Sequence, residues 1–212
     1  MDNGRFPRSG ASGRSFFFME WILASASPRR KELFAELVND FEILPAKGEE
    51  NAENAPTCRA LVETLASAKA REVAALPRAK GKAGLGSYTV VALHGNVMGK
   101  PKDETDAKRM LAALSGRTHE VYTGVCISVP CIDGTRKELI RSDCTEVVFE
   151  ELSEKAIENY AATGAPMDKA GAYGIQDGGL VREIKGSYSN VVGLPLELVK
   201  EMLDEIQNLS RR

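Results

Sequence analysis

Short apolar runs alternate with longer amphipathic segments along this chain. Strand-like runs rich in Val, Ile, Leu and Phe occur at 21–24, 41–44, 88–93, 97–98, 121–129, 139–149 and 180–184. Between them, apolar residues recur at helical spacing in segments at 28–37, 58–75, 104–114, 154–163 and 196–206. Because strands and helices are interspersed and their connections include both crossovers and hairpins, the pattern predicts an α/β fold with a mixed sheet.

Two connections bear on the boundaries of these elements. The Gly- and Lys-rich stretch 80–86 is expected to be a connection, with the next strand starting near Tyr88. The turn His94-Gly95-Asn96 predicts a hairpin with a short return strand. A third stretch, 45–56, is polar and acidic and is expected to form a loop that contains Glu49 and Glu50.

The stretch 25–30, Ser-Ala-Ser-Pro-Arg-Arg, joins the first predicted strand to the first helix. Ser27 is suited to the N-cap and Pro28 to the first helical position. The first turn of a helix has backbone N–H groups without intrahelical partners, and Arg29 and Arg30 add forked donors that match phosphate oxygens. The stretch therefore predicts a phosphate-binding site, and a capped surface helix whose arginines face water is the alternative.

Composition places the chain among ordinary soluble globular proteins. Of 212 residues, 43% are hydrophobic and 27% charged, and the formal net charge is −2, so nothing indicates a general attraction to nucleic acid or membranes. The apolar runs are too short to cross a bilayer. We expect one domain over residues 20–212, preceded by a flexible extension at 1–19 that is rich in Gly, Ser and Arg. An organelle-targeting peptide is the alternative for that extension.

The four cysteines have no paired Cys-x-x-Cys spacing, and the chain has two histidines, so the sequence does not favour a zinc site. Reduced thiols are expected, which favours a cytoplasmic location. Lys69 lies on the apolar stripe of its predicted helix, where a lysine either extends past its neighbours or projects into a site that needs a cation. The Gly-rich segment 168–176 is typical of backbone that approaches a ligand, or of a sharp chain reversal.

Five motifs in sequence order carry a resemblance that runs from about Trp21 to the C-terminus. They are Ser-Ala-Ser-Pro-Arg-Arg at 25–30, Gly-Lys-Pro at 99–101, Leu-Ser-Gly-Arg-Thr-His at 114–119, Asp-Lys-Ala-Gly-Ala-Tyr-Gly-Ile-Gln at 168–176 and Asn-Val-Val-Gly-Leu-Pro at 190–195. With these motifs the chain resembles the Maf family of nucleoside triphosphate pyrophosphatases. The resemblance implies a fold similar to inosine triphosphate pyrophosphatase, with an elongated mixed sheet and flanking helices around a deep cleft.

The resemblance also implies an activity: hydrolysis of a nucleoside triphosphate to the monophosphate and pyrophosphate, with a divalent cation, Mg²⁺ or Mn²⁺, as cofactor. A homodimer is a further expectation. Arg29, Thr89 and Gln176 match the positions that distinguish the branch acting on dTTP and UTP, so the expected substrate is a pyrimidine triphosphate, standard or modified. The residues expected to bind substrate are Ser25, Arg29, Arg30, Thr89, Asp168 and Gln176. Lys69 and Lys100 are the expected catalytic cations, and Glu50 is the expected catalytic carboxylate and metal ligand.

One position departs from the family pattern. Where the family has Ala-Asp-Thr, with the Asp assigned as the proton acceptor that activates water, this chain has Ser87-Tyr88-Thr89. A phenol with a reference pKa of about 10 is a poor base and a poor Mg²⁺ ligand at neutral pH. The acidic loop also departs, because Glu49-Glu50-Asn51 replaces Asp-Glu-Thr.

Three explanations of Tyr88 compete: an active enzyme that uses another carboxylate, a weakened or inactive nucleotide-binding relative, and a difference confined to this one position. We favour the enzyme because the other motif residues are retained.

Overall fold

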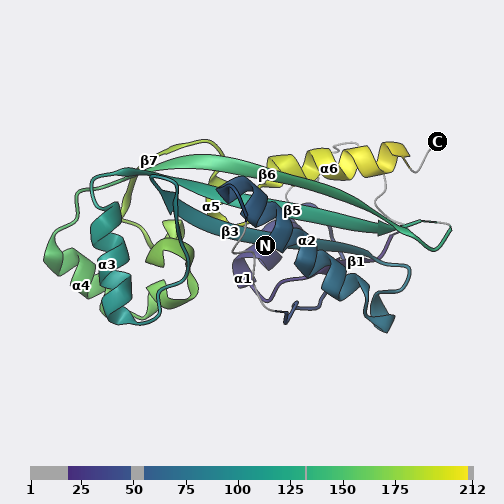
Figure 1. The fold of residues 1–212 in the computed structure, drawn as a ribbon, viewed down its shortest axis with the longest axis horizontal. Helices are drawn as coiled ribbons and strands as arrows, with labels where there is room; N and C mark the ends of the chain where they lie inside the picture. The colour runs from purple at the N-terminus through teal and green to yellow at the C-terminus, as the bar shows by residue number, and fades with distance from the viewer. Residues whose placement is uncertain (1–18, 49–54, 132, 210–212) are drawn as a thin grey trace, which may run out of the picture.

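The computed structural model describes residues 19–48, 55–131 and 133–209. These residues form a seven-stranded mixed sheet in the order β2-β1-β3-β5-β6-β7, with β4 paired to β3 (Figure 1). The strands are β1 (Trp21–Leu23), β2 (Phe41–Ile43), β3 (Ala83–Leu93), β4 (Asn96–Met98), β5 (Thr118–Pro130), β6 (Arg136–Phe149) and β7 (Val181–Lys185). β1 is parallel to β2 and β3, and the remaining pairs are antiparallel. The predicted α/β class with a mixed, elongated sheet is confirmed.

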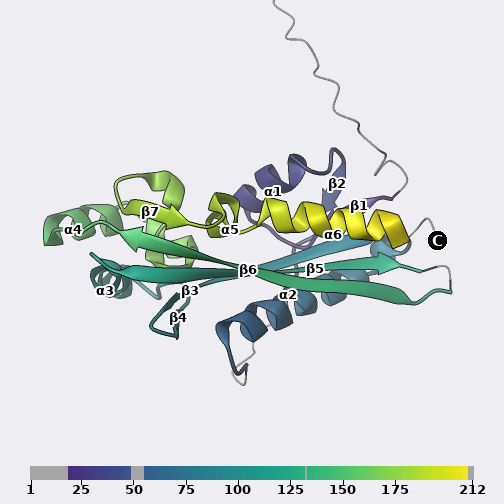
Figure 2. The same ribbon diagram turned by 90° about the horizontal axis from the view of Figure 1, so that it is seen from above.

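Helices cover both faces of the sheet. They are α1 (Pro28–Ala35), α2 (Cys58–Ala74), α3 (Glu104–Leu114), α4 (Glu154–Ala162), α5 (Tyr188–Val192) and α6 (Leu196–Leu209). Seen from above, α2 lies on one face of the long strands, whereas α1 and α6 lie on the other (Figure 2). α3 and α4 pack together at one end of the sheet (Figure 1). None of the described helices combines the length and the apolar content needed to span a bilayer.

Local sequence signals explain where four of the helices begin. The side chains of Ser27, Thr57, Asp103 and Ser153 each accept a hydrogen bond from a backbone N–H in the first turn of the helix that follows. Such caps satisfy donors that the helix itself leaves without partners. The predicted starts at Pro28, Cys58 and Glu104 are confirmed because the capping signal needs no distant contact.

The largest core cluster lies between the sheet and the helices α1 and α6. Leu85 and Val125 of the sheet are fully buried there, together with Phe34 of α1 and Leu203 of α6. Because side chains alternate along a strand, the neighbours of Leu85 on β3 face the opposite side, toward α2. This alternation decides which β3 residues can reach which helix.

Helix α2 packs on glycines rather than on side chains. A Cβ added to Gly86 would lie 2.3 Å from the carbonyl oxygen of Ala66, and one added to Gly124 would lie 2.3 Å from that of Val62. The expectation that 80–86 is a connection is therefore wrong for its second half, since β3 starts at Ala83. Glycines that signal a loop in the sequence are here strand positions that the backbone of a helix approaches closely.

Candidate active site

The site lies at a stretch of β3 that has no partner strand on one side among the described residues. β1 pairs with β3 as far as Leu85, and β4 pairs with it only from Val91 onward. The residues between them, including Tyr88 and Thr89, face an opening at this edge, and a cavity of about 560 Å³ occupies it. This cavity is at the carboxyl end of a parallel strand, where open α/β sheets commonly bind ligands.

The structure brings nine predicted site residues into the wall of this one cavity. They are Ser25, Arg29, Arg30, Lys69, Tyr88, Thr89, Lys100, Asp168 and Gln176. The tenth, Glu50, lies outside the described residues, as do Glu49 and Asn51. Five of the described wall residues are cationic and one is a carboxylate, so the cavity favours an anionic ligand.

The start of α1 is held in place by two serines. The hydroxyl of Ser27 accepts the backbone N–H of Arg30 at 3.4 Å. The hydroxyl of Ser25 accepts the backbone N–H of Ser27 at 3.2 Å and the Nη1 of Arg30 at 3.4 Å. Both contacts of Ser25 use its oxygen as acceptor, so its proton is suited to a phosphate oxygen at the end of the helix.

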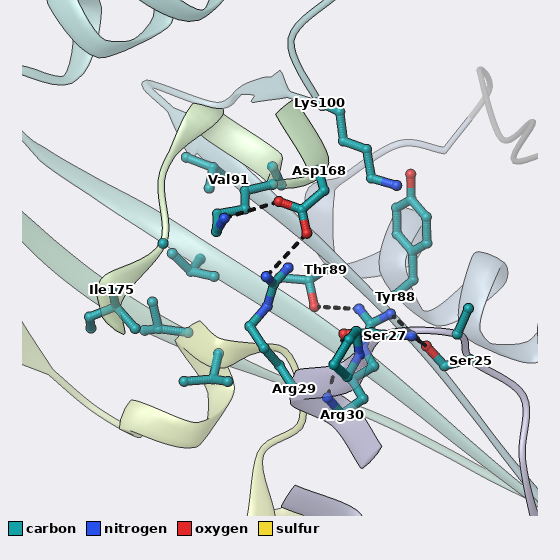
Figure 3. A pocket seen from close by; sticks show the side chains of 18 of the residues that line it. Ser25, Ser27, Arg29, Arg30, Tyr88, Thr89, Val91, Lys100, Asp168 and Ile175 are labelled. Atoms are coloured by element: carbon teal, nitrogen blue, oxygen red, sulfur yellow. Dashed lines mark hydrogen bonds and ion pairs between the residues drawn. The ribbon is translucent and has the colours of Figure 1, made fainter. Parts of the chain in front are cut away.

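Arg30 is anchored mainly to the protein itself. Its Nε donates to the carbonyl oxygen of Gly193 at 2.8 Å, and its Nη2 donates to the hydroxyl of Thr89 at 2.9 Å. Thr89 lies 2.9 Å from the hydroxyl of Thr123, which donates to the carbonyl oxygen of Asn190. The guanidinium thus joins α1, β3, β5 and α5 through a polar network that the sequence did not reveal. Figure 3 shows its first link, from Arg30 to Thr89.

Arg29 points into the cavity and pairs with Asp168, whose carboxylate lies 3.2 Å from its Nη1 (Figure 3). The ammonium of Lys169 lies 3.0 Å from the same carboxylate. Burial alone would raise the pKa of Asp168, but the hydrogen bond from Lys169 and the charge of Arg29 lower it below its usual value. Asp168 is therefore ionised at neutral pH and fixes the position of Arg29.

Tyr88 lies among the cations of the cavity. The ammonium of Lys69, on α2, is 5.6 Å from the centre of the Tyr88 ring. The side chain of Lys100 points toward the phenol oxygen (Figure 3). The position where the resemblance places an acid thus carries a phenol with two lysines around it.

The far side of the cavity is built by three short 3-10 turns, Ala165–Asp168, Ala170–Ala172 and Ile175–Asp177. Apolar side chains that were not among the predicted site residues complete it: Val91, Val121, Tyr173, Ile175, Val191 and Val192. Tyr173 and Ile175 lie within the motif at 168–176, and Val191 and Val192 lie within the motif at 190–195. No motif included Val91 or Val121. Gly171, at φ +69, is packed against Val91, since an added Cβ would lie 2.8 Å from that side chain. At Gly171, therefore, the backbone approaches the protein and not a ligand.

The comparisons with known proteins agree with the resemblance. Residues 20–206 match the family model described as Maf-like protein. The chain belongs to the Maf family. A dTTP/UTP pyrophosphatase from Thermococcus gammatolerans is 48% identical over 180 residues, which cover 84% of this chain and 92% of the relative. A dTTP/UTP pyrophosphatase from Moorella thermoacetica is 49% identical over 185 residues, with 86% and 92% covered. Among solved structures, a HAM1 protein from Coxiella burnetii aligns with a TM-score of 0.47 and 16% identity, covering 88% of this chain and 99% of that chain.

The described part of this Maf-family site does not form a metal site by itself. No group of three His, Cys, Asp or Glu side chains gathers anywhere among the described residues. The carboxylate of Asp168 in the described wall is paired with Arg29 and Lys169, and a tyrosine, Tyr88, stands where the resemblance places an acid. The predicted ligand Glu50 belongs to the segment outside the described residues.

Proposed function

We propose that this protein hydrolyses a pyrimidine nucleoside triphosphate, dTTP, UTP or a modified form of either, to the monophosphate and pyrophosphate. One observation carries the proposal: nine predicted site residues from distant parts of the chain line a single cationic cavity at the start of α1. Relatives support the proposal as well. Proteins named dTTP/UTP pyrophosphatase share nearly half of their aligned residues with this chain over most of its length.

In this proposal the triphosphate binds at the start of α1. The hydroxyl of Ser25 and the guanidinium of Arg29 donate to phosphate oxygens, while Arg30 mainly holds α1 and Thr89 in place. Lys69 and Lys100 stabilise the negative charge that builds up as the bond to the leaving pyrophosphate breaks. Water attacks, the monophosphate and pyrophosphate separate, and the proton of the water passes to a base.

The nucleoside end of the substrate binds against the turns at 168–176. Gln176 offers an amide donor and an acceptor, which suits the edge of a pyrimidine base. Val91, Val121 and Val192 supply an apolar surface for the ring and the sugar.

Tyr88 raises the question of which group acts as the base, because it stands where the resemblance places the proton acceptor. A neutral phenol accepts a proton poorly at neutral pH, and loss of a general base typically costs about 10²- to 10⁴-fold in rate. We propose a carboxylate of the acidic loop, Glu49 or Glu50, as the group that receives the proton. Glu50 is also the proposed ligand of Mg²⁺ or Mn²⁺, and Glu50→Gln should therefore weaken the dependence of the rate on either cation.

The test is a panel of standard and modified nucleoside triphosphates, assayed for pyrophosphate release with Mg²⁺ and with Mn²⁺. We expect dTTP, UTP or a modified pyrimidine triphosphate to give the highest kcat/KM, with purine triphosphates well below them. A correctly folded protein that releases pyrophosphate from no triphosphate would overturn the proposal. Tight binding of UTP by calorimetry without turnover would instead assign the chain to nucleotide binding. A cytoplasmic location and a homodimer belong to the same proposal, and size-exclusion chromatography with light scattering tests the dimer.

A further inference from the structure

Tyr160, on α4, lies behind the wall of the cavity and joins a wall residue, Gly174, to Asp177, which lies just beyond the wall segment 174–176. Its hydroxyl donates to a carboxylate oxygen of Asp177 and accepts the backbone N–H of Gly174 at 3.1 Å. Burial and the hydrogen bond to Asp177 raise the pKa of Tyr160, so the hydroxyl keeps its proton and remains a donor at neutral pH. Tyr160 is not among the residues that line the cavity.

Lys169 reinforces the same arrangement from the other side. Its ammonium lies 3.0 Å from Asp168 and 3.8 Å from Asp177, and its side chain is 12% exposed. The carboxylate of Asp177 therefore accepts from a phenol and faces a nearly buried ammonium. Charge-assisted contacts of this kind hold a carboxylate more firmly than neutral ones do.

Gly174 is the backbone position on which these groups converge. A Cβ added there would lie 2.6 Å from Cε of Lys169 and 2.8 Å from a carboxylate oxygen of Asp177. Gly174 has φ −115°, which other residues adopt readily, so close packing and not backbone conformation favours glycine here. The two residues that follow, Ile175 and Gln176, line the cavity.

We propose that Tyr160 is a positioning residue for nucleotide recognition, which holds the backbone at 174–176 where Gln176 reads the base. This inference rests on the proposed function. The hydroxyl of Tyr160 holds Gly174, where the segment begins, and Asp177, which directly follows it. Loss of this hydroxyl should therefore let the backbone at 174–176 move. The triphosphate side is built on α1 and is linked to Tyr160 only at a distance, through Asp177, Lys169 and Asp168, so we expect binding of phosphate groups to depend on Tyr160 much less than binding of the base.

The experiment compares Tyr160→Phe with the wild-type full chain by calorimetry, using UTP and inorganic tripolyphosphate as ligands. Removing one hydrogen bond to a charged group is expected to raise the Kd for UTP about tenfold. The Kd for tripolyphosphate should change less than twofold. Tyr188→Phe is the matched control, because Tyr188 is 50% exposed and lies outside the cavity wall, and it should bind both ligands as the wild type does.

A second variant tests the same link from its other end. Asp177→Asn should weaken UTP binding selectively, and the double variant with Tyr160→Phe should lose less than the product of the two single effects. In turnover, Tyr160→Phe should raise the KM for UTP far more than it lowers kcat. Unchanged UTP binding, or an equal loss for UTP and tripolyphosphate, would overturn the positioning role alone. A wild type that binds neither UTP nor any other pyrimidine triphosphate would overturn the proposed function as well.

Discussion

The ammonium of Lys69 lies 5.6 Å from the centre of the Tyr88 ring, so a lysine of α2 faces a phenol where the Maf pattern has a carboxylate. The close packing of α2 on the sheet brings the two together. Gly86, two residues before Tyr88 on the same face of β3, allows α2 to approach at van der Waals distance. The position of Lys69 beside Tyr88 thus depends on the packing of α2 against β3.

Replacement of Tyr88 by Asp should restore the acid of the family motif beside Lys69. We expect kcat for pyrophosphate release to change less than about tenfold, because a carboxylate of the acidic loop, Glu49 or Glu50, is the proposed base and already accepts the proton. Tyr88→Asn is the matched control, since it has the shape of Asp without its charge, and it should not accelerate the reaction. A rise of about 10²- to 10⁴-fold in Tyr88→Asp would contradict the proposed base, because it would show that the reaction lacks an efficient base until a carboxylate stands at position 88.

The two arginines of α1 should differ in their effects when each is changed to lysine: Arg30 should affect stability, and Arg29 should affect substrate binding. Arg30→Lys loses the donors to Gly193 and Thr89, so the free energy of unfolding should fall by about 1–2 kcal/mol in urea titrations. Arg29→Lys should leave that free energy within about 0.5 kcal/mol of wild type, because its partner Asp168 is exposed. Its KM for UTP should instead rise about tenfold. Equal stability losses in the two variants would contradict this division of roles.

Gly124 should not tolerate a methyl group. In Gly124→Ala the new Cβ would meet the backbone of Val62, which cannot move without displacing α2, and we expect a loss of about 2 kcal/mol or more in the free energy of unfolding. Gly99→Ala is the control, since no atom lies within 4 Å of the added Cβ. Thermal and urea unfolding of both variants check the prediction. A Gly124→Ala protein as stable as wild type would show that α2 is less tightly seated than described.

Stability should fall in mild acid because of His119. This ring is 2% exposed, its Nε2 lies 2.8 Å from the hydroxyl of Tyr173, and burial lowers its pKa to about 4. Below pH 6.5 the unfolded chain takes up a proton that the folded chain refuses until about pH 4, so the free energy of unfolding falls as the pH falls through this window.

The comparison with His119→Gln isolates this effect from other groups that titrate in acid. Between pH 7 and pH 5 the wild type should lose about 2 kcal/mol more than His119→Gln, which has no ring to protonate. His94→Gln, on the exposed hairpin turn, should follow the wild type. Parallel pH profiles for wild type and His119→Gln would contradict the assignment.

The features that sequence predicted best are those set by neighbouring residues. Ser27 and Thr57 cap their helices, and the hairpin turn at His94 and Gly95 has the left-handed backbone that its sequence indicates. The gathering of Ser25 and Gln176 in one cavity followed from the family resemblance, because no local pattern relates residues so far apart.

Features that depend on distant contacts were missed. In the sequence Gly84 and Gly86 indicate a loop, whereas in the structure they are strand residues on which α2 packs. The network from Arg30 through Thr89 and Thr123 to Asn190 joins four elements, and no spacing in the sequence encodes it. For the same reason the hydrogen bonds from Arg30 to Gly193 and Thr89 were not predicted, and its role as a phosphate ligand stays a prediction.

The most direct test of the central claim is the identity of the products, followed by ³¹P NMR as the full-length wild type acts on UTP with Mg²⁺ or Mn²⁺. We expect UMP and pyrophosphate in equal amounts, formed together and without UDP, and much slower formation of both in Arg29→Gln. Appearance of UDP and orthophosphate would contradict the proposed function. So would a correctly folded protein that leaves UTP and the other pyrimidine triphosphates intact.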